Sequence, residues 1–456
     1  MRFVDRSEEQ RRLRRAIESD MAQFIVIYGR RRLGKSTLVK KVLNEKDLYF
    51  MADNSEQNRQ RELLAQLLAD SYPGFDKVNY PSWESLFEHL DMRCDKGTTL
   101  CLDEFPYMVK TCPELPSILQ KIVDRKERKY HLILCGSSQR MMQKLVLDAS
   151  DPLYGRADVI LKLGFIPYPY LQEVLDIDAV QAVEEYSVWG GVPRYWELRN
   201  KEDNLLEAIR YNMLSTNGTL YEEPMRLFMD DLTQSTQSET IMSVIGNGCN
   251  RLSEIAARLG KKATDLGNPL NKLIQLGYIE RELPFNENLK NSKKSIYRIA
   301  DPFMDFYYRF IIPNRSLIGL GHVKRVEQRI VAEFPRYVSL HWEKICRDSV
   351  SGNELFGHVW DIAARWWGNV SETERIELDV VALSEDKKHL LVGECKWTEK
   401  ENSEILMKQL VEKASKLPFA QNKEIIPVLF LKHPPLGNGK ENILLPEAVA
   451  QLNCRL

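Results

Sequence analysis

One short segment near the N-terminus restricts the fold of this chain more than any other feature. Residues 29–36 read Gly-Arg-Arg-Arg-Leu-Gly-Lys-Ser, after the apolar run FIVIY and before the helical pattern STLVKKVL. In such a loop the backbone N–H groups and the start of the following helix surround phosphate groups, because both carry partial positive charge. The pattern therefore predicts a phosphate-binding loop between a buried strand and a helix, with ATP as the ligand.

The positions of this loop have separate expected roles. Lys35 is expected to reach the β- and γ-phosphates, and Ser36 is expected to bind Mg²⁺. Arg30, Arg31 and Arg32 occupy the variable part of the loop, where they contact either the nucleotide or a DNA phosphate, or are simply solvated. The predicted nucleotide-binding residues of the loop are Gly29, Arg30, Arg31, Arg32, Leu33, Gly34, Lys35, Ser36 and Thr37.

A second apolar run ends in two carboxylates. Residues 98–104 read TTLCLDE, a strand pattern that finishes in Asp103 and Glu104. Asp103 is expected to hold Mg²⁺ through its coordination shell, and Glu104 to orient or deprotonate the attacking water. This part of the sequence therefore predicts hydrolysis of ATP in addition to binding.

Two further features each have two interpretations. The strand-like run HLILCGSS ends in Ser137 and Ser138, whose hydroxyl groups either sense the γ-phosphate or cap the strand. Arg156, in the segment PLYGR, is either an arginine finger or a solvated surface residue. An arginine finger would act on the nucleotide of its own subunit or of a neighbouring one. The sequence leaves these alternatives open.

The alternation of patterns indicates an α/β fold with several domains. In residues 1–200, strand patterns alternate with helical patterns, which indicates the parallel sheet of a P-loop ATPase domain, covered on both faces. Residues 201–310 are mostly helical, and within 251–301 two helical patterns precede two short strands, the order of a winged helix-turn-helix. Residues 330–456 form a last α/β block, and 311–330 is expected to be a linker.

The last block has charged residues inside apolar strands. Asp379 lies in RIELDVVAL and Glu394 in HLLVGECKW, so a hairpin would place the two carboxylates side by side to share Mg²⁺ or Mn²⁺. Lys396 projects to the same face as Glu394 and would stabilise a hydroxide or the developing phosphorane charge. Glu343, on the preceding helix, would complete the set. The alternative is a structural salt-bridge cluster at a sheet edge.

Basic residues on the predicted winged helix make DNA a candidate partner. Such residues would neutralise several phosphates and make binding sensitive to salt. The alternative is a packing module that transmits the nucleotide state to the rest of the chain. The basic residues are Lys261, Lys262 and Lys272 on or before the second helix, and Lys290, Lys293, Lys294 and Arg298 on the wing; Asn271, beside Lys272, is a further polar candidate.

Six motifs in order resemble the archaeal-type ATPase family, a branch of the AAA+/STAND class of P-loop ATPases. They are FVDRxxE from residue 3, GRRRLGKST, LDEFPY, GSS, PLYGR and GGVPRYW, and the likeness covers about 1–230. The resemblance implies that the segment around Asp5 and Arg6 lies near the adenine. The C-terminal block resembles the domain of unknown function 234, which is related to the PD-(D/E)XK nuclease fold, with E…D…E-x-K in order.

Composition and charge indicate which partners and which cellular compartment to expect for the protein. The net charge of −1 argues against binding of nucleic acid by bulk electrostatics, so a DNA surface would be a local patch. The N-terminal residues lack the apolar stretch of a secretory signal, and no run approaches a membrane span. The eight cysteines are scattered without a CxxC pair, which indicates a reducing, cytoplasmic setting.

Three functions remain from the sequence. The first is an ATP-driven enzyme that acts on DNA and cuts it at the C-terminal site with Mg²⁺ or Mn²⁺. The second is a regulatory switch ATPase that forms a nucleotide-dependent homo-oligomer, with a C-terminal domain that only binds a partner or nucleic acid. The third is a DNA-remodelling helper in which slow ATP turnover moves DNA.

Overall fold

The computed structural model describes residues 3–125, 127–232, 235–288, 294–435 and 441–454, which form two compact units. The nucleotide unit comprises Phe3–Phe165 and Arg226–Thr233. The second unit comprises Ile166–Met225 and Gln234–Leu456. Residues 166–200, which the sequence groups with the first domain, therefore pack within the second unit.

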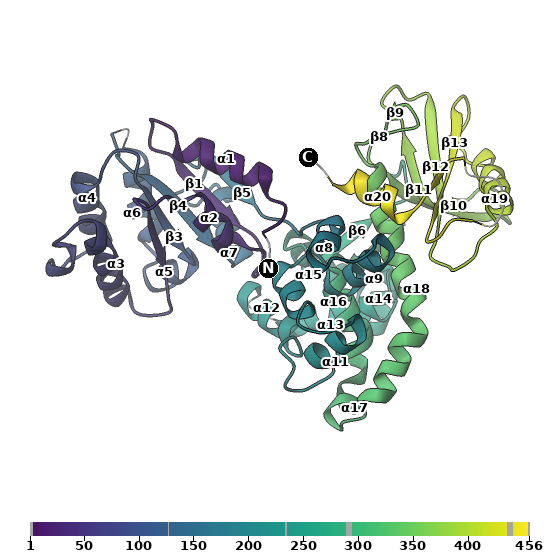
Figure 1. Ribbon diagram of the computed structural model, residues 1–456, viewed down its shortest axis with the longest axis horizontal. Helices are drawn as coiled ribbons and strands as arrows, with labels where there is room; N and C mark the ends of the chain where they lie inside the picture. Colours follow the sequence, from purple (N-terminus) through teal and green to yellow (C-terminus); the bar gives the residue numbers. More distant parts are fainter. Residues whose placement is uncertain (1–2, 126, 233–234, 289–293, 436–440, 455–456) are drawn as a thin grey trace. The chain divides into compact units, whose positions relative to one another are not determined.

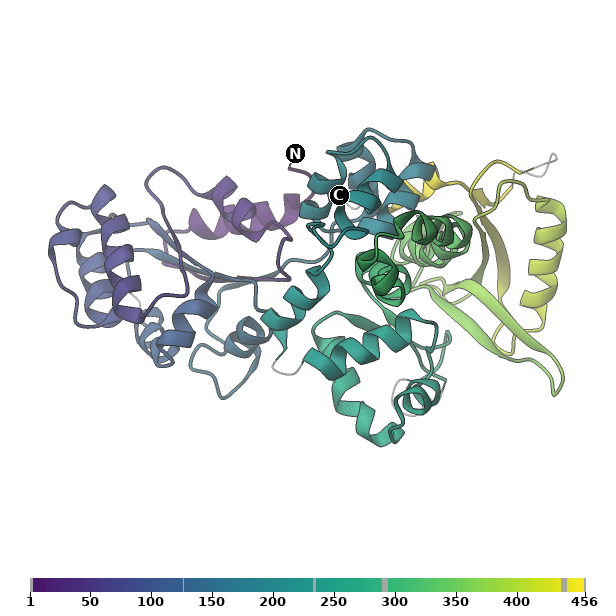
Figure 2. The same cartoon turned by 90° about the horizontal axis from the view of Figure 1, so that it is seen from below.

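The nucleotide unit is built on a five-stranded parallel sheet in the order β2-β3-β4-β1-β5. Figures 1 and 2 show helices on both faces of this sheet. The strands are β1 (Phe24–Tyr28), β2 (Leu48–Met51), β3 (Thr99–Asp103), β4 (His131–Gly136) and β5 (Val159–Lys162). The helices are α1 (Ser7–Ile17), α2 (Lys35–Val42), α3 (Gln57–Ser71), α4 (Trp83–Arg93), α5 (Phe105–Thr111), α6 (Leu115–Val123) and α7 (Gln139–Leu147).

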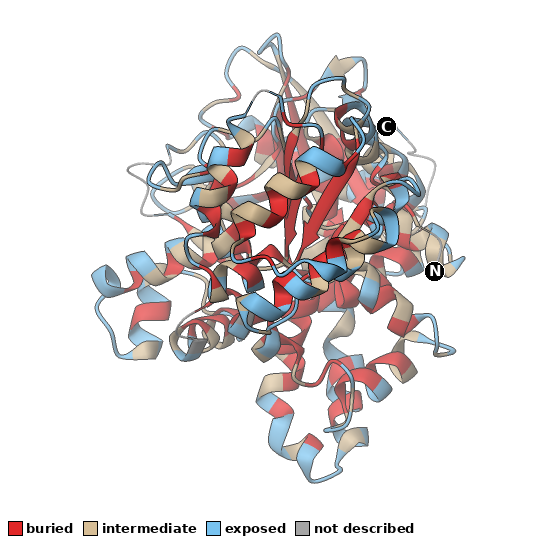
Figure 3. Cartoon of the chain, turned by 90° about the vertical axis from the view of Figure 1, so that its left-hand side faces the viewer, coloured by how far each residue is buried: buried red, intermediate tan, exposed pale blue. Residues whose placement is uncertain are grey.

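The three central strands are the ones that the sequence predicts. Every residue of β1, β3 and β4 is buried, because helices cover both faces of the sheet (Figure 3). Strands of this kind read as continuous apolar runs. The edge strands β2 and β5 are partly exposed and shorter, and their sequences, LYFM and VILK, carry a weaker signal. In a parallel sheet the ends of β1 and β3 lie at the same edge, which places the phosphate loop and Asp103 near each other.

The second unit begins with helices and a small hairpin. The expected helix, helix and hairpin of residues 251–301 are present, with β6 and β7 antiparallel. Lys290 and Lys293 lie outside the described residues. The elements are α8 (Tyr168–Leu175), α9 (Ala179–Trp189), α10 (Pro193–Arg199), α11 (Leu205–Met213), α13 (Ser235–Gly246), α14 (Leu252–Leu259), α15 (Gly267–Gln275), β6 (Ile279–Glu282) and β7 (Ile296–Ile299). Most of α12 (Glu223–Asp231) belongs to the nucleotide unit.

The segment expected to be a linker, 311–330, is helical instead. It contains α17 (Arg315–Gly319) and the first residues of α18 (Val323–Val350), and it is joined to α16 (Pro302–Phe306) by π and 3₁₀ turns. Asn314 stabilises part of this helical segment, since its Nδ2 donates to the carbonyl of Phe310 at 2.8 Å and its Oδ1 accepts from Arg329 at 2.6 Å. None of the described helices is long and apolar enough to cross a membrane.

The C-terminal block is a second five-stranded sheet, in the order β10-β11-β12-β13-β14. β10, β11 and β12 pair antiparallel, and β12, β13 and β14 pair parallel. Figure 2 shows this sheet between α18 and α19. The elements are β8 (Glu354–Leu355), β9 (His358–Val359), β10 (Ala364–Asn369), β11 (Arg375–Leu383), β12 (His389–Lys396), α19 (Ser403–Ser415), β13 (Glu424–Leu431), β14 (Ile443–Leu444) and α20 (Pro446–Asn453).

Candidate functional site

The predicted phosphate loop joins the end of β1 to the start of α2. Gly34 precedes α2 in the left-handed region, with φ of 84°, a conformation that glycine adopts without strain. Gly29 approaches the neighbouring strand closely, and a Cβ there would lie 2.6 Å from the carbonyl oxygen of Leu163. The loop therefore needs glycine at both positions. With this backbone, the N-terminus of α2 points toward the centre of the loop, as binding of an anion requires.

Lys35 is buried in the middle of this loop. Its Nζ donates to the carbonyl oxygens of Gly29 at 2.9 Å and Arg30 at 3.0 Å. Burial lowers the pKa of Lys35, although the charges of Glu104 and Asp103 favour its protonated form. Backbone carbonyls thus hold the ammonium group inside the curve of the loop, where phosphate groups would be bound.

Ser36 and Asp103 lie in direct contact. The Ser36 hydroxyl donates to Asp103 Oδ2 at 2.6 Å, and the hydroxyl of Tyr49 on β2 donates to the same oxygen. Burial opposes ionisation of Asp103, but the hydrogen bonds that it accepts, first those from Ser36 and Tyr49, together outweigh burial and hold the pKa of the carboxyl below its usual range. One hydroxyl and one ionised carboxylate form a donor set that fits Mg²⁺, which prefers a few protein oxygens together with water and phosphate.

Glu104 follows β3 and is held by the end of β4. Its Oε2 accepts hydrogen bonds from the hydroxyl of Ser137 at 2.9 Å and from the backbone N–H of Ser137 at 3.3 Å. The backbone of Glu104 is in the left-handed region, with φ of 52°, which is uncommon for residues other than glycine. Ser137 therefore orients the carboxylate that the sequence assigns to the attacking water.

The N-terminal segment lies beside the phosphate loop. Asp5 and Arg6 both have left-handed backbone conformations. The Arg6 guanidinium is buried and donates to the carbonyl of Gly164 at 2.5 Å and to Glu9 at 2.9 Å. Since Gly164 directly follows Leu163, which contacts Gly29, this segment borders the loop. Its contact with adenine stays a prediction.

The three arginines of the loop differ in environment. Arg30 is buried, with its guanidinium 5.6 Å from the centre of the Phe165 ring. Arg31 is exposed, and Arg32 is half-buried with φ of 71°. Arg31 and the exposed Thr37 are thus the loop positions most accessible to a ligand from solvent.

Arg156 lies near the N-terminal ends of the strands, whereas the phosphate loop lies at their C-terminal ends. Arg156 precedes β5, and Asp158, two residues later, forms hydrogen bonds with Phe24 at the start of β1. Five strand residues span about 16 Å. Arg156 also forms a bidentate ion pair with Asp124, at 2.8 and 3.0 Å. This placement does not agree with a finger acting on its own subunit, and action on a neighbouring subunit stays a prediction.

Asp379 and Glu394 are neighbours in the C-terminal sheet. They lie one step beyond the last paired residues of β11 and β12, Val380 and Gly393. The Cys395 N–H donates to Asp379 Oδ2 at 2.9 Å. Burial raises the pKa of Asp379 to about 7, and the negative charges of Glu343 and Glu394 act in the same direction.

Two lysines neutralise Glu394. Lys396 Nζ lies 2.8 Å from Oε1, and Lys413 Nζ, on α19, lies 3.0 Å from Oε2. Burial opposes ionisation of Glu394, but these two cations outweigh it and lower the pKa. The sequence did not reveal Lys413, because it lies on α19, a helix separate from the two strands that carry the carboxylates, and a lysine on a helix carries no motif.

Glu343 belongs to an ion network with arginines. Its Oε2 lies 3.6 Å from Arg365 and 3.9 Å from Arg347. The same arginines approach Glu282 on β6, which also pairs with Arg298 at 2.9 Å. Within the described parts of the chain, no three His, Cys, Asp or Glu side chains are grouped so that they could hold a metal ion. Among the carboxylates that the sequence assigned to a metal in the C-terminal block, Asp379 and Glu394 are the pair that lies side by side.

The raised pKa of Asp379 predicts a dependence of stability on pH. Because the folded state holds this proton more tightly than the unfolded state, its contribution to stability is present near pH 4 and is lost as pH rises through about 7. Asp379→Asn is therefore expected to stabilise the protein more at pH 8 than at pH 5, with a difference of about 2 kcal/mol between the two pH values. Thermal unfolding in EDTA at both pH values measures this.

Asp386→Asn is the matched control for this experiment. Asp386 is an exposed aspartate in the turn between β11 and β12, and hydrogen bonds from Ser384 and Lys388 lower its pKa to about 2. It is expected to give no stabilisation at pH 8. An equal gain from Asp379→Asn at pH 5 and pH 8 would contradict the assignment of a buried, protonated Asp379.

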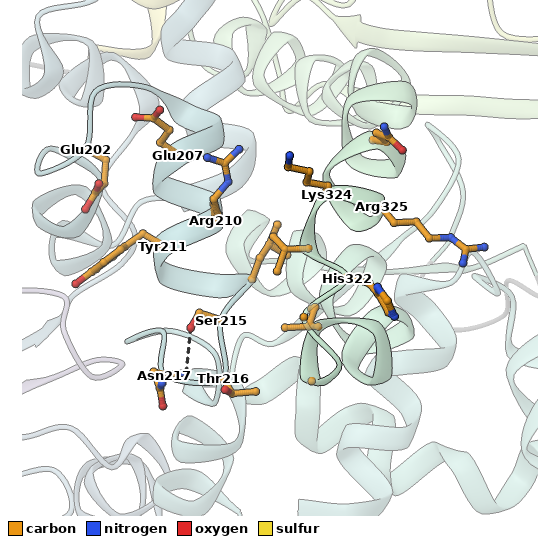
Figure 4. Close-up of a pocket in the computed structure, with 16 residues that line it drawn as sticks. Glu202, Glu207, Arg210, Tyr211, Ser215, Thr216, Asn217, His322, Lys324 and Arg325 are labelled. Atoms are coloured by element: carbon orange, nitrogen blue, oxygen red, sulfur yellow. Dashed lines mark hydrogen bonds between the residues drawn. The ribbon is translucent and has the colours of Figure 1, made fainter.

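A groove elsewhere in the second unit contains none of the predicted residues. It is lined by α11, the segment after it and the start of α18 (Figure 4). Its charges are mixed, with Glu202 and Glu207 opposite Lys324 and Arg325, and Arg210 pairs with Glu327 at the side. This mixture does not favour one class of ligand.

Comparison with known proteins agrees with the nucleotide site. Residues 3–195 match a family described as an ATPase domain predominantly from Archaea, and residues 307–407 match archaeal and bacterial proteins of unknown function. An uncharacterized protein of Methanocaldococcus jannaschii is 32% identical over 423 residues, covering 88% of this chain and 89% of the relative. An uncharacterized ATP-binding protein of the same organism is 46% identical over 46 residues, covering 10% of this chain and 78% of the relative.

A solved structure supports the fold. A Walker-type ATPase of Pyrococcus abyssi superposes with a TM-score of 0.52 at 19% identity, covering 67% of this chain and 96% of that one. Together with the loop geometry around Lys35, Ser36 and Asp103, the matches make this protein a P-loop ATPase. The chain belongs to the archaeal-type ATPase family, and in it the ATPase domain precedes the domain of unknown function.

Proposed function

We propose that this ATPase acts on DNA and that Asp379, Glu394 and Lys396 form a metal-dependent nuclease site. The observation that carries the proposal is the position of Asp379 beside Glu394 on adjacent strands, with Lys396 bonded to Glu394. Two carboxylates and a lysine at the ends of apolar strands are expensive to bury unless they bind a partner or metal. Metal-dependent cleavage of a phosphodiester bond uses two carboxylates and a lysine of this kind.

The three residues have separate roles in this proposal. Asp379 and Glu394 would hold Mg²⁺ or Mn²⁺, which lowers the pKa of a bound water when present. Lys396 would stabilise negative charge on the attacking oxygen or on the phosphate. Lys413 reaches the same carboxylate and would hold Glu394 in place when Lys396 turns toward a substrate.

The DNA contact is assigned to the middle of the chain, which we interpret as a winged helix formed by α14, α15 and the β6–β7 hairpin. Lys261 and Lys262 are exposed ahead of α15, and Lys272 lies on it. The wing contributes less than its sequence suggests, because Lys294 pairs with Glu287 and Arg298 pairs with Glu282. The face of α15 is therefore the proposed contact with phosphates.

Cleavage of plasmid DNA tests the nuclease site. In Mn²⁺ or Mg²⁺, wild-type protein is expected to cut, and Asp379→Ala and Lys396→Ala are each expected to reduce the rate by about 100-fold or more. Asp386→Ala, which removes an exposed carboxylate from the same pair of strands, is expected to cut at the wild-type rate. If both site variants still cut DNA at the wild-type rate, a contaminating nuclease or a different site on the protein is responsible for the cleavage.

One observation favours a second function, a regulatory switch ATPase that assembles with nucleotide. Lys396 and Lys413 occupy both oxygens of Glu394, and arginines surround Glu343, as in a structural salt-bridge cluster. The same assay separates the two proposals. If wild-type protein cuts DNA with neither metal, the C-terminal block acts by binding a partner or nucleic acid.

A further inference from the structure

Asp231 comes from a distant part of the chain and lies inside the nucleotide unit. The chain leaves this unit after Phe165 and returns to it with Arg226–Thr233, which includes the end of α12. The Asp231 side chain is buried, with 3% of its surface exposed. A buried carboxylate is costly unless its oxygens accept hydrogen bonds or meet a positive charge. The hydrogen bonds of the Asp231 side chain therefore indicate its role.

Asp231 accepts a hydrogen bond at the start of α7. Its Oδ1 lies 3.0 Å from the backbone nitrogen of Gln139, and both residues are buried. Gln139 is the first residue of α7, and the side chain of Ser138, in the preceding cap position, makes no capping hydrogen bond. The first N–H groups of a helix have no partner within the helix and carry partial positive charge. Asp231 thus supplies a cap that the local sequence does not.

The segment capped by Asp231 is also the one that holds Glu104. Ser137 bonds to Glu104 Oε2 through both its hydroxyl and its N–H, two residues before Gln139. Residues 137–139 are therefore fixed by Glu104 at one end and by Asp231 at the other.

We propose that Asp231 is a positioning residue for ATP hydrolysis, which holds residues 137–139 and through them the carboxylate of Glu104. The hydrogen bond from the Gln139 N–H to Asp231 fixes one end of this segment, and the hydrogen bonds from Ser137 to Glu104 fix the other. This inference depends on ATP hydrolysis alone and is independent of the proposed nuclease site.

Two substitutions separate the hydrogen bond from the charge. Asp231→Asn keeps an oxygen acceptor for the Gln139 N–H but removes the charge. We expect its kcat to stay within about threefold of wild type, since the Gln139 N–H keeps its acceptor. Asp231→Ala removes the acceptor as well, and we expect kcat to fall about tenfold with a smaller change in KM. Steady-state ATP turnover of the full chain measures these quantities, and thermal unfolding shows whether each variant is folded.

Asp148→Asn, at the exposed C-terminal end of α7, is the matched control and is expected to change neither kcat nor KM. A purely structural role of Asp231 would lower the unfolding temperature of Asp231→Ala without lowering the kcat of the folded protein. If folded Asp231→Ala hydrolyses ATP at the wild-type rate, or if Asp231→Asn loses as much activity as Asp231→Ala, the proposal is wrong. Asp231→Asn remains a test even if Asp231→Ala does not fold, because a tenfold loss of kcat in a variant that keeps the acceptor would contradict the proposal.

Discussion

Lys35→Ala is expected to reduce ATP turnover by about 100-fold or more and to weaken ATP binding strongly. The ammonium group is the positive charge held at the centre of the phosphate loop by the carbonyls of Gly29 and Arg30. Alanine removes the group that would meet the β- and γ-phosphates, and it leaves these two carbonyls without their donor. The loss is therefore expected to be larger for ATP than for adenosine.

Measurement of phosphate release and of nucleotide affinity tests this prediction. Lys41→Ala is the matched control, because Lys41 is an exposed lysine on the same helix, α2. It is expected to bind and hydrolyse ATP as the wild type does. Circular dichroism and thermal unfolding distinguish loss of function from loss of fold. Turnover that persists in a folded Lys35→Ala protein would refute the assigned role of the loop.

Glu104→Gln is expected to lower kcat for ATP hydrolysis by about 10² to 10³-fold while ATP affinity stays within a few-fold of wild type. Glutamine has nearly the same size and still accepts hydrogen bonds from Ser137 through its amide oxygen. It lacks the negative charge that would take a proton from the attacking water. The substitution thus separates hydrolysis from binding.

Glu62→Gln is a suitable control, since Glu62 is an exposed glutamate of α3 that pairs with Arg59. Its kcat is expected to match wild type. Single-turnover measurement of phosphate release, with binding followed by a fluorescent ATP analogue, gives both quantities. A Glu104→Gln protein that hydrolyses ATP at the normal rate would transfer the role of base to another group.

Burial explains which strands the sequence revealed. β1, β3 and β4 are covered on both faces and appear as apolar runs, so their order and their polar ends were predictable. β2 and β5 are edge strands with exposed positions, and neither was predicted. The helical segment of residues 311–330 was also unexpected, because its stability depends on contacts such as that of Asn314 with Arg329, which no local pattern encodes.

The residues of the candidate sites also differ in how far the sequence revealed them. Lys35, Ser36 and Asp103 belong to motifs whose spacing encodes their geometry, and the structure brings them together. Tyr49 and Asp231 reach the same site from elements that carry no motif, and only the packing of the chain shows them. For Arg156 the sequence left an arginine finger and a solvated surface residue both open, and the direction of β5 places this residue at the end of the strands away from the phosphate loop.

The interrupted path of the nucleotide unit has a consequence for biosynthesis. The part that ends at Phe165 contains every motif for ATP, yet the unit also includes Arg226–Thr233. Domains generally fold as units during synthesis, with N-terminal ones first. Here the first unit cannot complete its packing until the ribosome has released α12, so the cap on α7 arrives last. Competence to process nucleotide is then acquired only after residues 166–225 of the second unit have been made.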